Sequence, residues 1–205
     1  MTKVGLLSLI VAVAALLGGT ATAQSTGDEA AYFVAYYSNA NTAEAPDGVV
    51  RLINDGSQAT WESEGQLNGT LWAAIYVFDD SQELQSCCAC EVTADGLLSE
   101  SVNKQLTANT FTGNKLTRGV IKIVSSSCGD PTHPVVASGL RGWFTTVDAA
   151  TNIPSKGPFY VTRTELHDAN LGGVELENLG TLCSYGLTIG SGKGLCSCTP
   201  EDQDF

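Results

Sequence analysis

Positively charged residues are scarce in this sequence. Its 205 residues include 10 Lys or Arg against 22 Asp or Glu, which gives a formal net charge of −12 at pH 7. An acidic surface of this kind repels nucleic acids and anionic lipids, so we expect no nucleic-acid partner. It favours either solubility or the binding of cations, and solubility is the simpler interpretation.

The sequence also lacks the common catalytic motifs and has only two histidines. It contains no GxSxG, HExxH or EF-hand pattern. His133 lies between prolines in the loop 131–134, and His167 directly precedes Asp168. Either can act as a general base beside an acid, although a histidine in a loop is more often simply solvated. These patterns assign no cofactor and no catalytic residue.

Long apolar runs are missing except at the N-terminus. There, Lys3 precedes an almost unbroken apolar run at 4–17, and Ala21-Thr22-Ala23 supplies the small-x-small pattern of a signal peptidase site. The run is shorter than the ~20 residues that a spanning helix needs. We therefore expect a cleaved signal peptide, a mature chain that begins at Gln24 without a membrane span, and a secreted, extracellular or periplasmic location.

Short strand-forming segments separated by turn residues make up most of the remaining chain. Runs of β-branched and aromatic residues predict strands, of which 71–79 is the most apolar and is expected to be central. Asp55-Gly56 is a hairpin-type turn pair after the strand at 49–54, with 60–64 as a short partner strand. The other strands are expected at 31–37, 119–125, 140–147 and 159–166.

One late segment has a helical pattern instead. Apolar residues recur at helical spacing within 173–185, with Asp168 or Asn170 as the expected N-cap and Gly190-Ser191-Gly192 at the end. No strand–helix alternation is present. We predict a mainly β fold, an antiparallel β-sandwich or open barrel with one C-terminal helix.

The expected organisation is one folded domain after the signal peptide. A single disulfide-rich β domain is expected at 48–199. The flanking parts are a signal peptide at 1–23, a flexible segment with the first strand at 24–47, and an acidic tail at 200–205.

Seven cysteines are the most distinctive feature of the chain. In an exported protein they indicate disulfides, and the odd number fits three bridges and one free thiol. Zinc or copper(I) binding by the CCxC and CxC clusters is the alternative, but neither has CxxC spacing, so we expect no metal. The candidates are Cys87, Cys88, Cys90, Cys128, Cys183, Cys196 and Cys198.

One pairing is predicted more specifically. Cys183 shares the apolar stripe of the predicted helix, so it should face the core. The glycine-rich chain after the helix can reverse direction at little steric cost. We therefore predict that Cys183 bonds to Cys196 or Cys198, which would clamp the loop onto the helix, with the other cysteine of that pair free to reach the CCxC cluster.

The cysteine blocks carry a resemblance to a known group. The chain has YVFD at 76–79, CCACEVTADGL at 87–97, LTANTFTG at 106–113 and GSGKGLCSC at 190–198. Over roughly residues 48–199 it resembles a group of secreted bacterial proteins of acidobacterial type. The resemblance implies an exported bacterial protein with a shared fold, and no activity or catalytic residue. Glu91 stands where that group commonly has proline, which affects only the local turn.

Two classes of function fit these observations. We favour a non-enzymatic structural or binding module, whose partner is an extracellular polymer, another protein or a second copy of the chain. The alternative is a secreted hydrolase or metal-dependent enzyme that uses His133, His167 and nearby acids. One cleft holding both histidines and a carboxylate would favour the enzyme. Among the tryptophans, Trp61 is expected to be exposed and Trp72 to be in the core.

Overall fold

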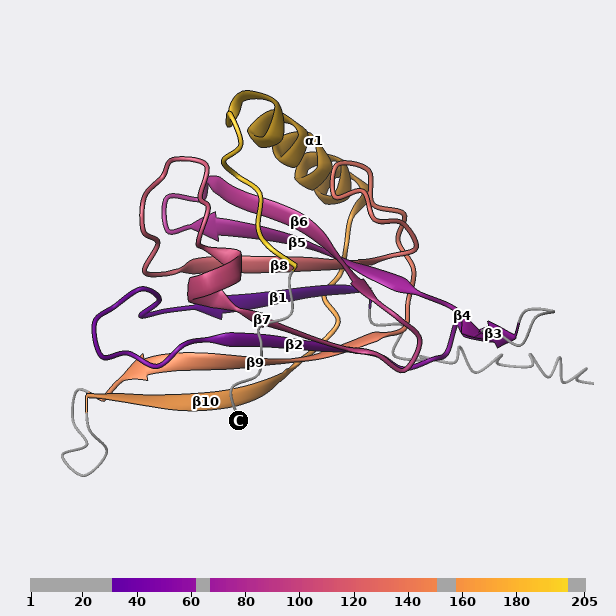
Figure 1. Cartoon of the computed structure of the whole chain (residues 1–205), viewed down its shortest axis with the longest axis horizontal. Coiled ribbons are helices and arrows are strands. Elements are labelled where there is room, and N and C mark those ends of the chain that lie inside the picture. Colours follow the sequence, from indigo (N-terminus) through magenta and orange to yellow (C-terminus); the bar gives the residue numbers. More distant parts are fainter. Residues whose placement is uncertain (1–30, 62–66, 151–157, 199–205) are drawn as a thin grey trace, which may run out of the picture.

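The computed structural model describes residues 31–61, 67–150 and 158–198. These residues form two antiparallel four-stranded sheets and one C-terminal helix. The sheets pack face to face as a sandwich, and the helix covers the outer side of one sheet (Figure 1). The predicted mainly β fold is confirmed, and the sandwich is the form that it takes.

The first sheet has β5 at its centre, as predicted. β5 pairs antiparallel with β8 on one side and with β6 on the other, and β1 pairs with the far side of β8. The strand order is β1 (Tyr32–Tyr37), β8 (Gly119–Ser126), β5 (Leu71–Asp79) and β6 (Leu84–Val92).

The second sheet is built around β2 and β9. Its strand order is β10 (Phe159–Leu166), β9 (Leu140–Ala149), β2 (Val49–Asn54) and β7 (Leu97–Ser101). A separate two-stranded ladder of β3 (Thr60–Trp61) and β4 (Leu67–Asn68) projects from the sandwich (Figure 1).

The side chains of β5 supply two hydrophobic cores. Successive residues of a strand point to opposite faces of the sheet. Ile75 and Val77 therefore belong to the core between the sheets, and Tyr76 and Phe78 to the core under the helix. Ile75, Val77 and Tyr76 are completely buried, and full burial of a large apolar side chain stabilises the fold by about 1.5–3 kcal/mol.

The helix α1 (Gly173–Ile189) lies across the outer face of the first sheet. Leu179 and Cys183 are its buried contacts with that sheet. An ion pair between Glu175 and Lys122 of β8 (2.5 Å) fixes its first turn. The predicted helix is confirmed and runs one turn beyond 185. Its N-cap is Gly172, not Asp168 or Asn170, because the Asp168 carboxylate accepts hydrogen bonds from the backbone of β1 instead.

Three consecutive elements between residues 84 and 106 were not predicted, and one turn was misread. β6 and β7 lie where no strand was expected, and β7 leads into a short π-helix, η1 (Val102–Leu106). The hairpin prediction at Asp55-Gly56 is wrong, because β2 pairs with β7 and β9 while β3 pairs with β4. The remainder of the predicted 60–64 strand lies outside the described residues.

Within the residues that the structure describes, no helix has the length and apolar character needed to cross a bilayer.

Candidate binding groove beside the C-terminal helix

Three disulfides join β6 to the C-terminal part of the chain. Because strand residues alternate between faces, Cys87 points to the helix, and Cys88 and Cys90 point between the sheets. Cys87 bonds to Cys183 of α1, with 5.9 Å between the Cα atoms. Cys88 bonds to Cys196 and Cys90 to Cys198, with Cα separations of 5.3 and 5.2 Å. The helix and the tail are therefore fixed to opposite faces of one strand.

The chain after the helix runs parallel to β6. The Cys87 N–H donates to the Gly194 carbonyl (3.0 Å), and the Cys196 N–H donates to the Cys87 carbonyl (3.2 Å). This parallel bridge aligns the two CxC motifs, so each cysteine of one meets a cysteine of the other. The last described residues thereby cover the outer edge of β6.

The predicted clamp between Cys183 and the final CxC motif is wrong. Cys183 is fully buried against the sheet, as predicted, but its partner is Cys87. Cys196 and Cys198 pack on the other face of β6, in the core between the sheets. The strand itself separates them from Cys183, so a bond between them is geometrically blocked.

The number of bridges agrees with the prediction of three disulfides and one free thiol. Cys128 is the free cysteine and is half-buried after β8. A hydrogen bond with the Ser126 hydroxyl lowers the pKa of the Cys128 thiol, against an opposing effect of burial. The thiol donates to the His133 carbonyl at 3.3 Å, which helps to close the loop 128–135.

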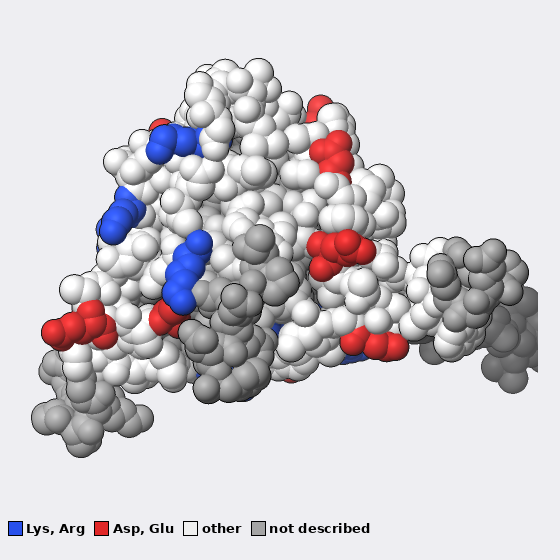
Figure 2. All heavy atoms as spheres, in the orientation of Figure 1, with Lys and Arg blue, Asp and Glu red and all other residues white. Residues whose placement is uncertain are grey.

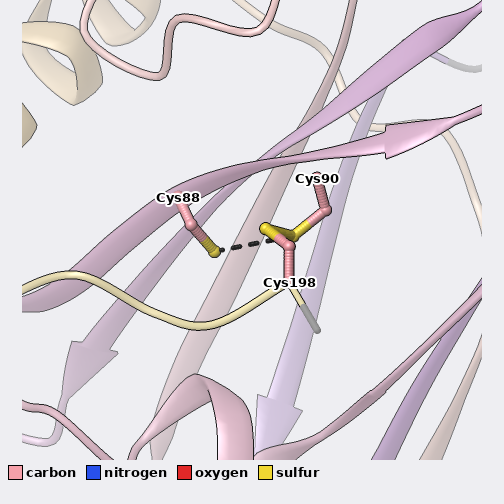
Figure 3. Close-up of side chains that lie close together, drawn as sticks. All are labelled: Cys88, Cys90 and Cys198. Atoms are coloured by element: carbon pink, nitrogen blue, oxygen red, sulfur yellow. Dashed lines mark hydrogen bonds between the residues drawn. A yellow bond between two sulfur atoms is a disulfide. The ribbon is translucent and has the colours of Figure 1, made fainter. Parts of the chain in front are cut away.

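The sulfur atoms of Cys88, Cys90 and Cys198 lie within 4.8 Å of one another (Figure 3). The Sγ atoms of Cys88 and Cys90 are 3.8 Å apart. This closeness follows from the side-by-side disulfides, in which all three sulfurs are bonded. An oxidised sulfur offers no thiolate, which is the form that binds a metal.

A groove of about 850 Å³ lies between α1 and the loop that follows β8. The loop contributes its segment from Thr132 to Val135, and the helix contributes one side along most of its length. Residues on the helix side are Gly173, Leu176, Glu177, Gly180, Thr181, Ser184, Tyr185 and Thr188. The groove thus joins two segments that lie about 40 residues or more apart in the sequence.

The loop is held in place by hydrogen bonds and by its contact with the helix. Asp130 Oδ1 accepts from the Thr132 N–H (2.8 Å) and the Thr132 hydroxyl (2.6 Å), which lowers the pKa of Asp130. The Tyr76 hydroxyl donates to the Pro131 carbonyl (2.7 Å). A side chain at Gly180 would overlap the Thr132 carbonyl, so only glycine permits this close approach of loop and helix.

The helix side of the groove has hydroxyl groups but little charge. Thr181, Ser184, Tyr185 and Thr188 follow the i, i+3, i+4, i+7 spacing that places side chains on one helix face. All four are exposed, and Tyr185 is 62% exposed. No charged residue occurs from 178 to 192. In Figure 2, wide uncharged areas separate the charged side chains on the visible face.

The two histidines are in different places. His133 lines the groove, and its Nδ1 atom lies 3.3 Å from Asp130 Oδ2. His167 is exposed after β10 and is not among the residues that line the groove. The groove therefore holds one histidine with the carboxylates of Asp130 and Glu177 nearby, and it does not unite the two histidines of the enzyme hypothesis.

The tryptophans do not line the groove. Trp61 is 76% exposed on β3, as predicted. Trp72 is only half-buried, so its side chain is more exposed than the predicted core position. Its ring packs against Gly129, at the start of the loop that forms the groove.

A second, polar cleft of about 540 Å³ lies elsewhere on the surface. Its lining includes Tyr36, Asp80, Arg118 and Asp148. Arg118 is already paired with Asp80 at 2.8 Å. Both partners are exposed, and an exposed ion pair of this kind contributes little to stability.

No protein-family model, curated protein or solved structure matches this chain. The case for a function therefore comes from the groove and the disulfides.

Proposed function

We propose that the protein is an exported, non-enzymatic binding module that holds a neutral glycan chain in the groove between α1 and the loop 132–135. The hydroxyl stripe of Thr181, Ser184, Tyr185 and Thr188 carries this proposal. Hydroxyl groups donate and accept hydrogen bonds, which matches the hydroxyls of a sugar. The exposed Tyr185 ring adds an apolar surface with a polar end.

The charge of the protein favours a neutral ligand. The chain has a net charge of −12, which repels anionic polymers. The helix side of the groove carries only Glu177 as a charged group, and the rest is hydroxyl, glycine or apolar. A neutral, hydroxyl-rich polymer brings no charge of its own that would have to be desolvated at this surface.

The disulfides support an extracellular or periplasmic location. Such bridges form and persist in oxidising compartments and are rare in the cytosol. The chain has three, all between β6 and the C-terminal part of the chain, and Cys87–Cys183 ties the groove helix α1 to the sheet. They are compatible with the proposed signal peptide and with cleavage before Gln24, which the mass of the exported protein would test.

Polysaccharide binding tests the proposed function. The purified protein would be screened against soluble neutral glucans, mannans and galactans by affinity electrophoresis, with an anionic polysaccharide for comparison. We expect retardation by a neutral polymer, and an affinity about tenfold lower for Tyr185→Ala. Trp61→Ala is the matched control, because Trp61 is an exposed aromatic outside the groove, and it should bind like the wild type. Lack of binding to every neutral polymer would contradict the proposal.

The alternative function is a hydrolase that acts on the same bound polymer. The His133–Asp130 pair at the groove is the observation that favours it. Reducing-end release from the bound polymer measures this directly. Hydrolysis that is lost in His133→Ala would establish the alternative, and binding without hydrolysis would support the module.

A further inference from the structure

The outer edge of β10 has no partner strand in the described part of the chain. Every residue from Phe159 to Leu166 pairs with β9 on one side. On the other side, no backbone hydrogen bond reaches these residues from any described residue. Five consecutive positions, 161–165, are exposed, so both faces of the strand are open along this stretch.

Both edges of the first sheet are at least partly covered by the chain itself. The C-terminal segment lies along β6, as described above. β1 is bridged at Phe33 by Asp168, and the Ala169 N–H donates to the Tyr32 carbonyl. β10 has neither such a cover nor the proline or lysine that commonly protects an exposed edge.

The sequence of β10 is complementary to itself in one antiparallel register. Arg163 and Glu165 lie two residues apart, on the same face of the strand. If two copies pair about a twofold axis at Thr164, each Arg163 lies directly opposite Glu165 of the other copy. In an antiparallel pair, the numbers of any two residues that lie opposite each other have the same sum. No other register therefore places Arg163 opposite Glu165. Opposite charges across a strand pair stabilise it, and like charges destabilise it.

We propose that the protein forms a twofold dimer by antiparallel pairing of β10 with β10 of a second copy, in the register centred on Thr164. The second sheet then continues across the dimer as one eight-stranded sheet. Such a contact is isologous, which is the symmetry of most protein dimers.

This dimer does not depend on the proposed glycan binding. The groove lies beside α1, on the outer face of the first sheet, whereas β10 is the edge of the second sheet (Figure 1). Two copies would present two grooves, so binding to a long polymer would gain from multivalency.

Sedimentation velocity over a wide range of protein concentration tests the dimer. We expect the wild type to dimerise with increasing concentration. Arg163→Glu and Glu165→Arg should each weaken the dimer about tenfold or more, because like charges then face each other twice. The double swap Arg163→Glu/Glu165→Arg restores opposite charges in the same register and should restore the dimer.

The control is Lys115→Glu, which makes the same change in net charge as Arg163→Glu at another exposed residue. It should dimerise like the wild type. Circular dichroism and intact mass would confirm that every variant keeps its fold and three disulfides. A wild type that stays monomeric at its highest soluble concentration overturns the proposal. The proposal is also overturned if Arg163→Glu leaves the dimer unchanged, or if the double swap fails to restore association.

Discussion

Asp130 shows how one side chain fixes a loop of the groove. Its hydrogen bonds from Thr132, together with His133, hold its pKa below the usual range for an aspartate. The charged form therefore stabilises the folded loop. This contribution is complete above the pKa of an unfolded aspartate, about 3.9, and is lost as the pH falls further through the folded pKa.

Carboxyl NMR titration would measure this effect. We expect Asp130 to titrate below the ordinary aspartate value in the wild type, and closer to it in Thr132→Ala, which removes the hydroxyl donor. Asp55 is a suitable internal comparison, because its lowered pKa involves Ser57 and Arg141 and should not change in that variant. A wild-type Asp130 that titrates at or above the ordinary value would contradict the hydrogen bonding described here.

At the scale of residues, the sequence predicted the number of disulfides correctly but not which cysteines they join. Seven cysteines in a chain that we expected to be exported led to a prediction of three bridges and one thiol, which the structure confirms. The pairing of Cys183 was wrong because β6 was not recognised as a strand. Once Cys87 is placed on a strand, its side chain must point away from Cys88 and Cys90, and the helix side is the face left to it.

Gly180 and Gly186 allow a matched test within one helix. At Gly180, an added Cβ would overlap the Thr132 carbonyl, whereas nothing lies within 4 Å at Gly186. We expect Gly180→Ala to destabilise the protein by about 1–3 kcal/mol, because the loop must move. Gly186→Ala should stabilise it by about 0.5–1 kcal/mol through helix propensity. Urea unfolding measures both, and equal effects of the same sign would argue against the close contact of loop and helix.

We expect the Cys87–Cys183 disulfide to be the main contact that holds α1 on the first sheet. It closes a long loop, with a sequence separation of 96. Its removal in Cys87→Ser/Cys183→Ser should cost about 2–5 kcal/mol and increase hydrogen exchange in α1. Cys128→Ser is the control, because it removes a thiol without a bridge and should change stability by less than about 1 kcal/mol. An unchanged exchange rate in α1 would show that packing alone holds the helix.

At the scale of elements, the sequence identified those with a clear periodic pattern. The bounds of β2, β5 and β10 match the predicted ranges, because each is a run of β-branched or aromatic residues between turns. β6 was missed because residues 86–90 at its centre are neither β-branched nor aromatic, and the pairing with β5 that makes them a strand is visible only in the fold. The hydroxyl stripe of α1 is visible in the sequence, but the loop that faces it comes from a distant segment, and only the fold brings them together.

At the scale of the whole molecule, the proposed groove and the proposed dimer edge belong to different sheets of the sandwich. The disulfides fix α1 and the tail to the first sheet, so the groove has a rigid wall. The free edge of β10 belongs to the second sheet. A binding groove on one sheet and a self-pairing edge on the other would suit a module that attaches to a repeating polymer at two points.

Chemical-shift mapping by NMR tests most directly whether the groove beside α1 binds a neutral glycan. An oligosaccharide from the polymer identified by affinity electrophoresis would be titrated into the isotope-labelled protein. We expect the largest amide shifts at Thr132, His133 and Val135 and at Thr181 to Thr188, with little change on β3 or β9. Shifts centred on any other surface, or no shift at saturating oligosaccharide, would contradict it.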